Sequence, residues 1–249
     1  MRAVIRINDS ANYLLECWRT GLTNAGYTIV PGIDNPQSDD VLVLWNRSIR
    51  DEEMAQRFEA AGALVLVAEN GYLGKKWNGK KWFALSVGHH NGGGTFPVAL
   101  GESRMRKHGF VIAPWRVGGS EIIALPQRGI GEPGVAMPKW WACPTWTTRI
   151  RPHKGIRETI ELEDDLRDAK AVVTWGSGAA IRALAMGIPV FYDYHKWIGH
   201  QGGTHISKAN PIDPQHGDRQ AAFEAVFAAM WTDEEVATGE PFEELRKCV

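Results

Sequence analysis

The chain has 249 residues, of which 44% are hydrophobic, and this excludes an extensively disordered protein because it supplies apolar surface for one large or two small cores. Lysine and arginine number 28 against 29 aspartates and glutamates, so the net charge is -1 and a histone-like polyanion binder is excluded. A nucleic-acid partner would have to bind to a local basic patch.

The spacing of the cysteines and the N-terminal residues indicate the cellular compartment of the protein. Cys17, Cys143 and Cys248 lie far apart without a Cys-x-x-Cys pair, which argues against a zinc site or a disulfide framework. Only three apolar residues separate Arg2 from Arg6, and no apolar run approaches the length of a membrane span. We therefore expect a soluble, cytoplasmic protein that does not contact a membrane.

Strand and helix patterns alternate through the first part of the chain. Leu14, Cys17, Trp18 and Leu22 form one apolar helical stripe. The stretch SIRD at 48–51 has capping-box spacing for a second helix. The expected elements are strands at 3–7, 27–30, 41–46 and 63–69, and helices at 13–25 and 51–61. Such β-branched strands separated by helices predict a parallel sheet of the Rossmann type.

A second alternation follows a long irregular stretch at 70–108. Loops of that length in compact domains are usually functional. The elements expected next are strands at 109–114, 121–126 and 147–153, a charged helix at 161–169, and the strand-turn-helix-strand stretch AVVTWGSGAAIRALAMGIPVFYD at 171–193.

The last segment shows an amphipathic helical pattern. The apolar residues at helical spacing are Phe223, Val226, Phe227, Met230 and Trp231. They predict a helix that docks back across both halves. The expected fold is α/β, with two Rossmann-like halves at 1–108 and 109–212 and a C-terminal helical segment at 213–249 that bridges them.

The turn Gly176-Ser177-Gly178 begins a helix directly after a predicted strand. Its glycines permit close backbone approach, and the helix N-terminus offers free N–H groups and the positive end of the helix dipole. This combination indicates a seat for an anion or a phosphate. The alternative is that Ser177 only caps the helix.

The stretch RIRPHKG at 149–155 strengthens the anion-seat hypothesis. Arg149, Arg151, His153 and Lys154 end a predicted strand of the same half, and ligands of open α/β sheets bind at the carboxyl ends of strands. Cations beside a helix N-terminus suit a diphosphate. A solvated basic strand end is the alternative.

These two stretches resemble the donor half of GT-B-type glycosyltransferases of the capsule-polysaccharide, sialyl and Kdo-transferase kind. The resemblance covers 148–193, where RPHKG is followed by ELEDDLRDAKAVVTWGSGAAIRALAMGIPVFYD. ALPQRGIG at 124–131 and MWTDEEVATGEP at 230–241 resemble segments of small phage-encoded glycosyltransferases. Two positions depart from the pattern, since Lys154 stands where proline often follows histidine and Gly178 replaces a second serine.

The resemblance implies a glycosyltransferase that takes a sugar from a nucleotide-sugar, with a UDP-sugar as the expected donor and no further cofactor. It implies that 109–212 hold the donor and that 1–108 hold the acceptor and a base. The residues implied at the donor are Ser177, Gly176, Gly178, His153, Arg151, Gln127 and Arg128. No Asp-x-Asp motif is present, and His195, His200 and His205 do not have a metal-ligand spacing, so we expect metal-independent chemistry.

Three residues of the first half are candidates for the catalytic base. Asp9, Glu69 and His90 each follow or trail a strand end, and an inverting transfer needs one carboxylate or imidazole within reach of the acceptor hydroxyl. At most one of His89 and His90 would face the substrate. The alternatives are a helix cap for Asp9, a turn contact for Glu69, and an ordered glycine loop around the histidines.

The segment KKWNGKKWF at 75–83 interleaves lysines with tryptophans. The residues expected to contact phosphates or stack on an extruded base are Lys75, Lys76, Trp77, Lys80, Lys81 and Trp82. Arg104, Arg106, Lys107 and His108 would extend this patch. The hypothesis that follows is sugar transfer to a 5-hydroxymethylated pyrimidine of phage DNA, in the host cytoplasm. The alternatives are a hairpin whose tryptophans cover the core, a polysaccharide or lipopolysaccharide glycosyltransferase, and a non-catalytic nucleotide- or nucleic-acid-binding module.

Overall fold

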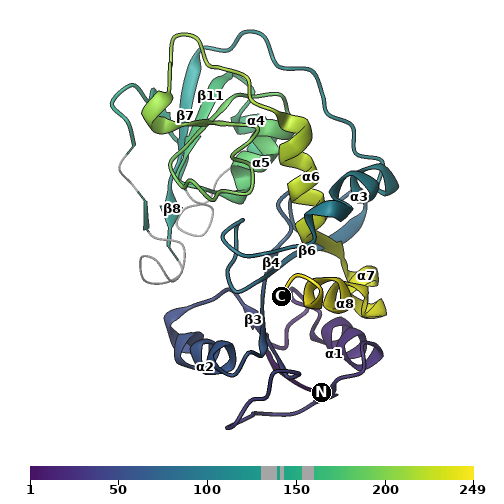
Figure 1. Cartoon of the computed structure of the whole chain (residues 1–249). Coiled ribbons are helices and arrows are strands. Elements are labelled where there is room, and N and C mark those ends of the chain that lie inside the picture. Colours follow the sequence, from purple (N-terminus) through teal and green to yellow (C-terminus); the bar gives the residue numbers. More distant parts are fainter. Residues whose placement is uncertain (130–138, 141–142, 153–159) are drawn as a thin grey trace.

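The computed structural model describes residues 1–129, 139–140, 143–152 and 160–249, and it has two α/β halves stacked one on the other (Figure 1). Each half is built on a sheet of mainly parallel strands, with helices packed against it. The predicted α/β fold with two Rossmann-like halves is confirmed.

The sheet of the first half has the order β14-β6-β4-β3-β1-β2. Its strands are β1 (Arg2–Arg6), β2 (Thr28–Ile29), β3 (Val41–Trp45), β4 (Leu64–Asn70), β6 (Lys80–Val87) and β14 (Met230–Thr232), and a short strand β5 (Lys76–Trp77) pairs with β6. β1 to β4 run parallel, whereas β6 runs antiparallel to β4 and β14 antiparallel to β6. The centre of the sheet is covered on both faces, which explains the unbroken apolar runs of β3 and β4.

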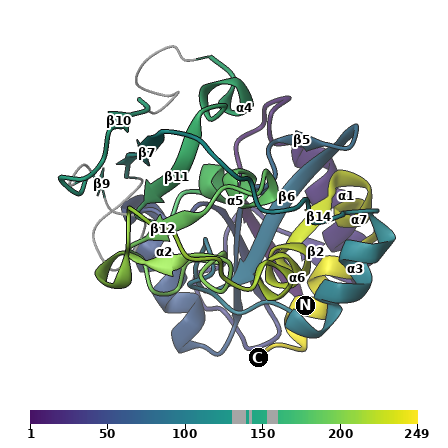
Figure 2. The same ribbon diagram turned by 90° about the horizontal axis from the view of Figure 1, so that it is seen from above.

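Helices cover both faces of this first sheet. On one face lies α2 (Ile49–Ala60), which buries Phe58, and on the other lie α1 (Leu15–Asn24), α7 (Asp233–Thr238) and α8 (Glu240–Arg246) (Figures 1 and 2). Close packing of α1 on α7 requires the glycine at position 21, because a Cβ there would overlap the carbonyl oxygen of Val236.

The sheet of the second half is parallel throughout, in the order β10-β7-β11-β12-β13. Its strands are β7 (Glu121–Leu125), β10 (Arg149–Ile150), β11 (Ala169–Thr174), β12 (Val190–Tyr192) and β13 (Thr204–His205), accompanied by α4 (Leu162–Asp165), α5 (Gly178–Ala185), a 3-10 turn η2 (Ile206–Lys208) and the short ladder of β8 (Gln127–Arg128) with β9 (Lys139–Trp140). The charged helix expected at 161–169 is shorter, because the chain already enters β11 at Ala169.

The C-terminal segment returns to the first half, as predicted. Helix α6 (Arg219–Ala229) packs on α3 (Gly101–Lys107) and buries Phe223 and Phe227. The helix ends earlier than the apolar spacing predicts, since Met230 and Trp231 belong to β14 and pair with β6. These two side chains are buried as expected, but as part of the sheet.

Two further sequence predictions differ from the structure. The stretch 70–108 is not one loop: it contains β5, β6, the 3-10 turn η1 (Val98–Leu100) and α3, and Asn78 and Gly79 form the turn between β5 and β6 with φ values of 51° and 76°. Conversely, 109–114 is not a strand. Phe110 and Ile112 pack on the core without joining a sheet, so their apolar pattern reflects burial alone.

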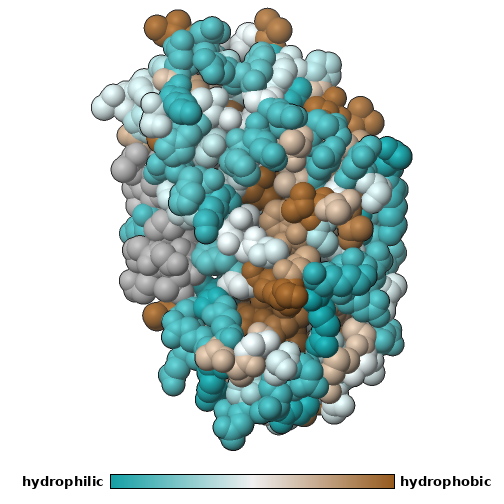
Figure 3. Space-filling view, in the orientation of Figure 1, coloured by the Kyte–Doolittle hydropathy of each residue, from teal (hydrophilic) through white to brown (hydrophobic). Residues whose placement is uncertain are grey.

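One hydrophobic core runs through both halves. It contains Tyr72 and Trp82 from the first half, Val172 and Ile181 from the second, and Phe227 of α6. In the space-filling view, apolar side chains also gather on the surface at the level where the halves meet (Figure 3). None of the helices in the described part of the chain is long and apolar enough to cross a membrane.

Candidate functional site

A cleft of about 820 Å³ lies between the two halves. It forms where carboxyl ends of parallel strands from both sheets meet, the position at which α/β sheets bind ligands. The first half contributes Asn46, Glu69, Asn70, Gly71, Tyr72, Leu73, Gly74, Lys75, Lys76, Trp77 and Asn78; the second half contributes Pro126, Gln127, Gly129, Glu161, Glu163, Ser177, Gly178, Ala179 and Arg182. The cleft thus brings together predicted residues from both halves.

Glu69 lies at the end of β4 on the first-half wall of the cleft. The Tyr72 hydroxyl donates a hydrogen bond to its Oε1 at 2.7 Å, and the backbone N–H of Asn91 donates to the same oxygen at 2.7 Å. Among the described residues, Oε2 has no hydrogen-bond partner. One oxygen of this carboxylate is therefore fixed, and the other is available to a ligand.

Burial raises the pKa of Glu69 to about 7, although the hydrogen bonds from Tyr72 and Asn91 act in the opposite direction. A carboxylate with such a pKa is a stronger base than an exposed glutamate and is still largely deprotonated above neutral pH. Glu69 can therefore accept a proton from a hydroxyl in the cleft.

Ser177 stands on the opposite wall, at the N-cap of α5. Its Oγ accepts a hydrogen bond from the backbone N–H of Ala179 at 3.1 Å, and its own N–H donates to Thr174 Oγ1 at 3.0 Å. The serine caps the helix and also borders the cleft. The N-terminus of α5 is thus directed at any anion bound beside Ser177.

A side pocket of about 150 Å³ adjoins this helix end and has two arginines in its wall. Arg151 is 8% exposed; its Nε lies 2.8 Å from Asp165 Oδ2, and its Nη2 donates to the carbonyl of Ile160 at 2.6 Å. Arg182 forms an ion pair with Glu163. Both guanidinium groups are held by carboxylates, so they offer a fixed array of N–H donors with little net charge.

The remaining residues predicted at the donor have different outcomes. Gln127 lines the cleft, and the carbonyl of Gly176 accepts a hydrogen bond from Asn91 Nδ2. His153 and the side chain of Arg128 lie outside the described residues. Arg149, which the sequence also singled out, is bound to the carboxylates of Glu121 and Asp165 instead of facing the cleft.

His90 lies away from the cleft wall. Its ring is fully buried, neither ring nitrogen has a hydrogen-bond partner within the described part of the chain, and the ring stacks on His89 at 4.7 Å between centroids. Burial lowers the pKa of His90 to about 3. The loop after β6 does reach the cleft, since the neighbouring Asn91 contacts Glu69 and Gly176, but the His90 ring is enclosed in the protein beside His89.

We expect the substitution His90→Leu to make the free energy of unfolding less dependent on pH in the acidic range. With an ordinary pKa of 6.5 unfolded and about 3 folded, His90 binds a proton less readily in the folded state, so stability falls as the pH drops below 6.5. Between pH 7.5 and pH 5 the loss amounts to about 2 kcal/mol. Urea unfolding of both proteins at the two pH values measures it, and equal losses in both would contradict a buried neutral histidine.

Asp9 is exposed after β1 and does not line the cleft. It does not cap the first helix either, because α1 begins at Leu15 behind a left-handed Leu14 with no side-chain cap. Of the three candidate bases, Glu69 alone lies among the residues that form the cleft.

The lysine and tryptophan segment divides into a cleft part and a core part. Lys75, Lys76 and Trp77 line the cleft, and Lys80 forms an ion pair with Glu234 on the surface at 2.7 Å. Lys81 lies over the ring of Phe83. The expectation that the Trp82 ring stacks on a base needs correction, because the ring is 0% exposed.

Core contacts explain the position of Trp82. Its Nε1 donates to the carbonyl of Trp77 at 2.9 Å, and its ring packs on Trp77, His108 and Phe227. Arg104, expected to extend a surface patch, is 4% exposed and bound to Glu235. Only the first four residues of the segment, Lys75 to Asn78, therefore line the cleft.

Sequence reasoning missed Tyr72 and Asn91, which hold the Glu69 carboxylate. Tyr72 is three residues beyond Glu69, in the turn that follows β4, and Asn91 stands before three glycines. The Asn-Gly-Gly-Gly run is the signal that could have indicated close backbone approach at this loop.

Two solved structures share this fold along nearly the whole chain. The KpsC β-Kdo 2,7 transferase of Thermosulfurimonas dismutans has a TM-score of 0.52 and 12% identity, with 99% of each chain covered. The KpsC β-Kdo 2,4 transferase of the same organism has a TM-score of 0.52 and 11% identity, with 92% of this chain and 91% of that chain covered. No family model and no curated protein matches the sequence. The chain therefore shares the fold of these two transferases.

Proposed function

We propose that this protein transfers a sugar from a nucleotide-sugar to a hydroxyl group of an acceptor. The observation that carries the proposal is the cleft itself, in which Glu69 of one half faces the capped helix end at Ser177 of the other. A base on one side and an anion seat on the other are the two groups that glycosyl transfer to a hydroxyl requires. The fold shared with two Kdo transferases supports the same activity.

In the proposed reaction Glu69 accepts the proton of the acceptor hydroxyl as that oxygen forms a bond to the anomeric carbon of the sugar. The bond from the anomeric carbon to the phosphate oxygen breaks, and its electron pair leaves with the phosphate. The N-terminus of α5 and the guanidinium N–H groups of Arg151 and Arg182 stabilise the charge on this leaving group. Gln127 and the backbone of Gly176 and Gly178 would complete the donor site. His153 and Arg128 stay predictions for contacts with the same phosphate. The proposed reaction requires no metal ion.

For the acceptor we propose an anionic molecule, with a 5-hydroxymethylated pyrimidine of phage DNA as the first candidate. Lys75, Lys76 and Trp77 on the cleft wall support it, since lysines attract phosphates and an indole stacks on an extruded base. The burial of Trp82 and the ion pair of Lys80 reduce the surface that DNA could use. The second candidate acceptor is an anionic saccharide, and the fold shared with Kdo transferases supports it.

The direct test is a transfer assay read by mass spectrometry. The purified protein is incubated with UDP-, GDP- and CMP-sugars, with a UDP-sugar as the expected donor, and with hydroxymethylated DNA or oligosaccharides as acceptors. A sugar-sized mass gain on one acceptor that is lost in Glu69→Gln supports the proposal. Nucleotide-sugar or DNA binding without turnover across the panel would overturn it in favour of a non-catalytic binding module.

Substitution of the cleft lysines separates the two acceptors. For a DNA acceptor, Lys75→Ala with Lys76→Ala should weaken binding and lower the slope of log affinity against log salt by about 1 for each phosphate that the protein no longer neutralises. Lys80→Ala is the matched control, because Lys80 is already paired with Glu234 outside the cleft. Filter binding at several salt concentrations measures both, and an unchanged slope in the double variant would exclude DNA.

A further inference from the structure

The loop at 88–95 joins the two halves at the cleft. It leaves β6, folds back and pairs with it again through the bridge between Val87 and Thr95. Its glycines fit closely against the second half: a Cβ on Gly92, whose φ is 82°, would lie 2.6 Å from the backbone nitrogen of Ile198. Such contacts leave no space for larger residues, so the loop has one fixed path.

Asn91 is the residue of this loop that contacts both walls of the cleft. Its backbone N–H donates to Glu69 Oε1 at 2.7 Å, and its side-chain Nδ2 donates to the carbonyl oxygen of Gly176. The orientation of the amide follows from chemistry, because a carbonyl oxygen accepts only and so must face the NH₂ group. The residue is 1% exposed, and its φ of 55° is one that asparagine tolerates.

These two contacts connect the base to the donor turn through a single residue. Gly176 directly precedes Ser177, so the amide of Asn91 fixes the backbone from which the N-cap of α5 starts. Tyr72 adds a second contact of this kind, since its hydroxyl binds Glu69 and its ring lies beside Gly178. Hydrogen bonds from Asn91 to both walls therefore connect Glu69 to the helix end.

We propose that Asn91 is a positioning residue that holds the Glu69 carboxylate in register with the donor turn at Ser177. The proposal rests on the function proposed above for this cleft. It makes the alignment of base and leaving group depend on one side-chain amide, and displacements of about 1 Å between reacting groups can cost about 100-fold in rate.

Two substitutions separate positioning from a merely structural role. Asn91→Gly keeps the backbone N–H and the positive φ but removes the amide, and Asn91→Asp keeps the shape but puts an acceptor against the Gly176 carbonyl. We expect kcat to fall by about 10- to 100-fold in both, with a smaller change in the KM for the acceptor. Asn24→Asp is the matched control, since the Asn24 amide also donates to a backbone carbonyl, that of Ala237, but outside the cleft.

A second readout does not depend on turnover. The carboxyl carbon of Glu69 is followed by ¹³C NMR against pH, and we expect its midpoint to move upward in Asn91→Asp, because a second carboxyl group stands beside it and the N–H bond is disturbed. A titration that is unchanged in both Asn91 variants, or a kcat that equals that of Asn24→Asp, would overturn the proposal. Absence of transfer by the wild-type protein together with a shifted titration would instead refute the function and leave the positioning contact standing.

Discussion

Glu69→Gln is expected to lower kcat by about 100- to 10,000-fold while leaving the fold intact. Glutamine keeps the size of the side chain and can still accept the hydrogen bonds from Tyr72 and the Asn91 backbone, but it cannot take the proton of the acceptor hydroxyl. In the wild-type protein, kcat should rise with pH through about 7, the pKa to which burial raises Glu69. A residual kcat close to that of the wild type would mean that another group is the base.

The same substitution should stabilise the protein at alkaline pH. The folded pKa of Glu69 is raised from 4.5 to about 7, so the folded state binds the proton more readily, and stability is lost as the pH rises between these values. The full shift corresponds to about 3 kcal/mol, and we expect about 2 kcal/mol because one oxygen opens to water in the cleft. Glu69→Gln removes this loss.

Urea unfolding at pH 5 and pH 8 measures the effect. Glu234→Gln is the matched control, since Glu234 is an exposed carboxylate outside the cleft. The control should follow the wild-type pH dependence, whereas Glu69→Gln should gain stability relative to the wild type only at the higher pH. A stability difference that is the same at both values would show that the Glu69 carboxyl has an ordinary pKa.

The parts of the site that the sequence predicts are those that depend on local order. β4 is an unbroken apolar run and Glu69 is its first polar residue, while Gly176, Ser177 and Gly178 sit between a strand and a helix. Residues that end parallel strands share one edge of a sheet, so the pattern of strands places Glu69 and Ser177 each at the carboxyl edge of its own sheet, and the packing of the two halves brings these edges together at the cleft.

The parts that the sequence does not predict depend on partners far along the chain. The loop after β6 folds so that Asn91 contacts Glu69 while the neighbouring His90 ring is fully buried, and no local pattern distinguishes these two positions. Met230 and Trp231 fit a helical spacing and a strand equally well, and pairing with β6 decides between them. The contact of Asn91 with Gly176 spans 85 positions, a separation over which a local pattern contains no signal.

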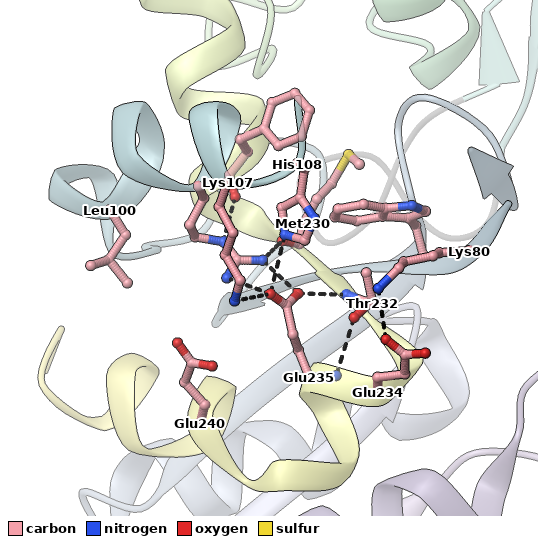
Figure 4. A network of polar contacts seen from close by, with 12 residues as sticks. Lys80, Leu100, Lys107, His108, Met230, Thr232, Glu234, Glu235 and Glu240 are labelled. Carbon is pink, nitrogen blue, oxygen red and sulfur yellow. Dashed lines mark hydrogen bonds and ion pairs between the residues drawn. The ribbon is translucent and has the colours of Figure 1, made fainter. Parts of the chain in front are cut away.

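The second large effect concerns Glu235, the centre of a polar network that attaches the C-terminal segment to α3 (Figure 4). Arg104 Nη2 lies 2.8 Å from its Oε2, and Lys107 Nζ and His108 Nε2 lie 2.7 and 3.1 Å from its Oε1. The N–H of Thr232 donates to Oε2 at 2.9 Å and completes a capping box for α7. One carboxylate thus binds an arginine, a lysine, a histidine and a helix end.

Arg104 makes this carboxylate hard to replace. It is 4% exposed, donates to the carbonyls of Phe227 and Met230 at 3.0 and 2.6 Å, and stacks on the ring of Trp231 at 3.7 Å. Burial by itself would raise the pKa of Glu235, but hydrogen bonds from His108, Arg104 and Lys107 hold it well below its ordinary value. The Glu235 carboxylate is therefore charged in the folded protein at neutral pH.

Glu235→Ala is expected to destabilise the protein by about 3 to 5 kcal/mol, because it leaves the buried Arg104 guanidinium without a counter-ion and removes the side-chain half of the α7 capping box, the bond from the Thr232 N–H. Glu234→Ala is the matched control one residue away, where the carboxylate pairs only with the exposed Lys80 and its loss should change stability far less. Because the folded pKa of Glu235 is lowered, its stabilising effect is present above about pH 4.5 and shrinks as the pH falls further. Urea unfolding of both variants at pH 7 and pH 4 tests this, and similar values for Glu235→Ala and Glu234→Ala would show that the C-terminal segment is held by its apolar contacts alone.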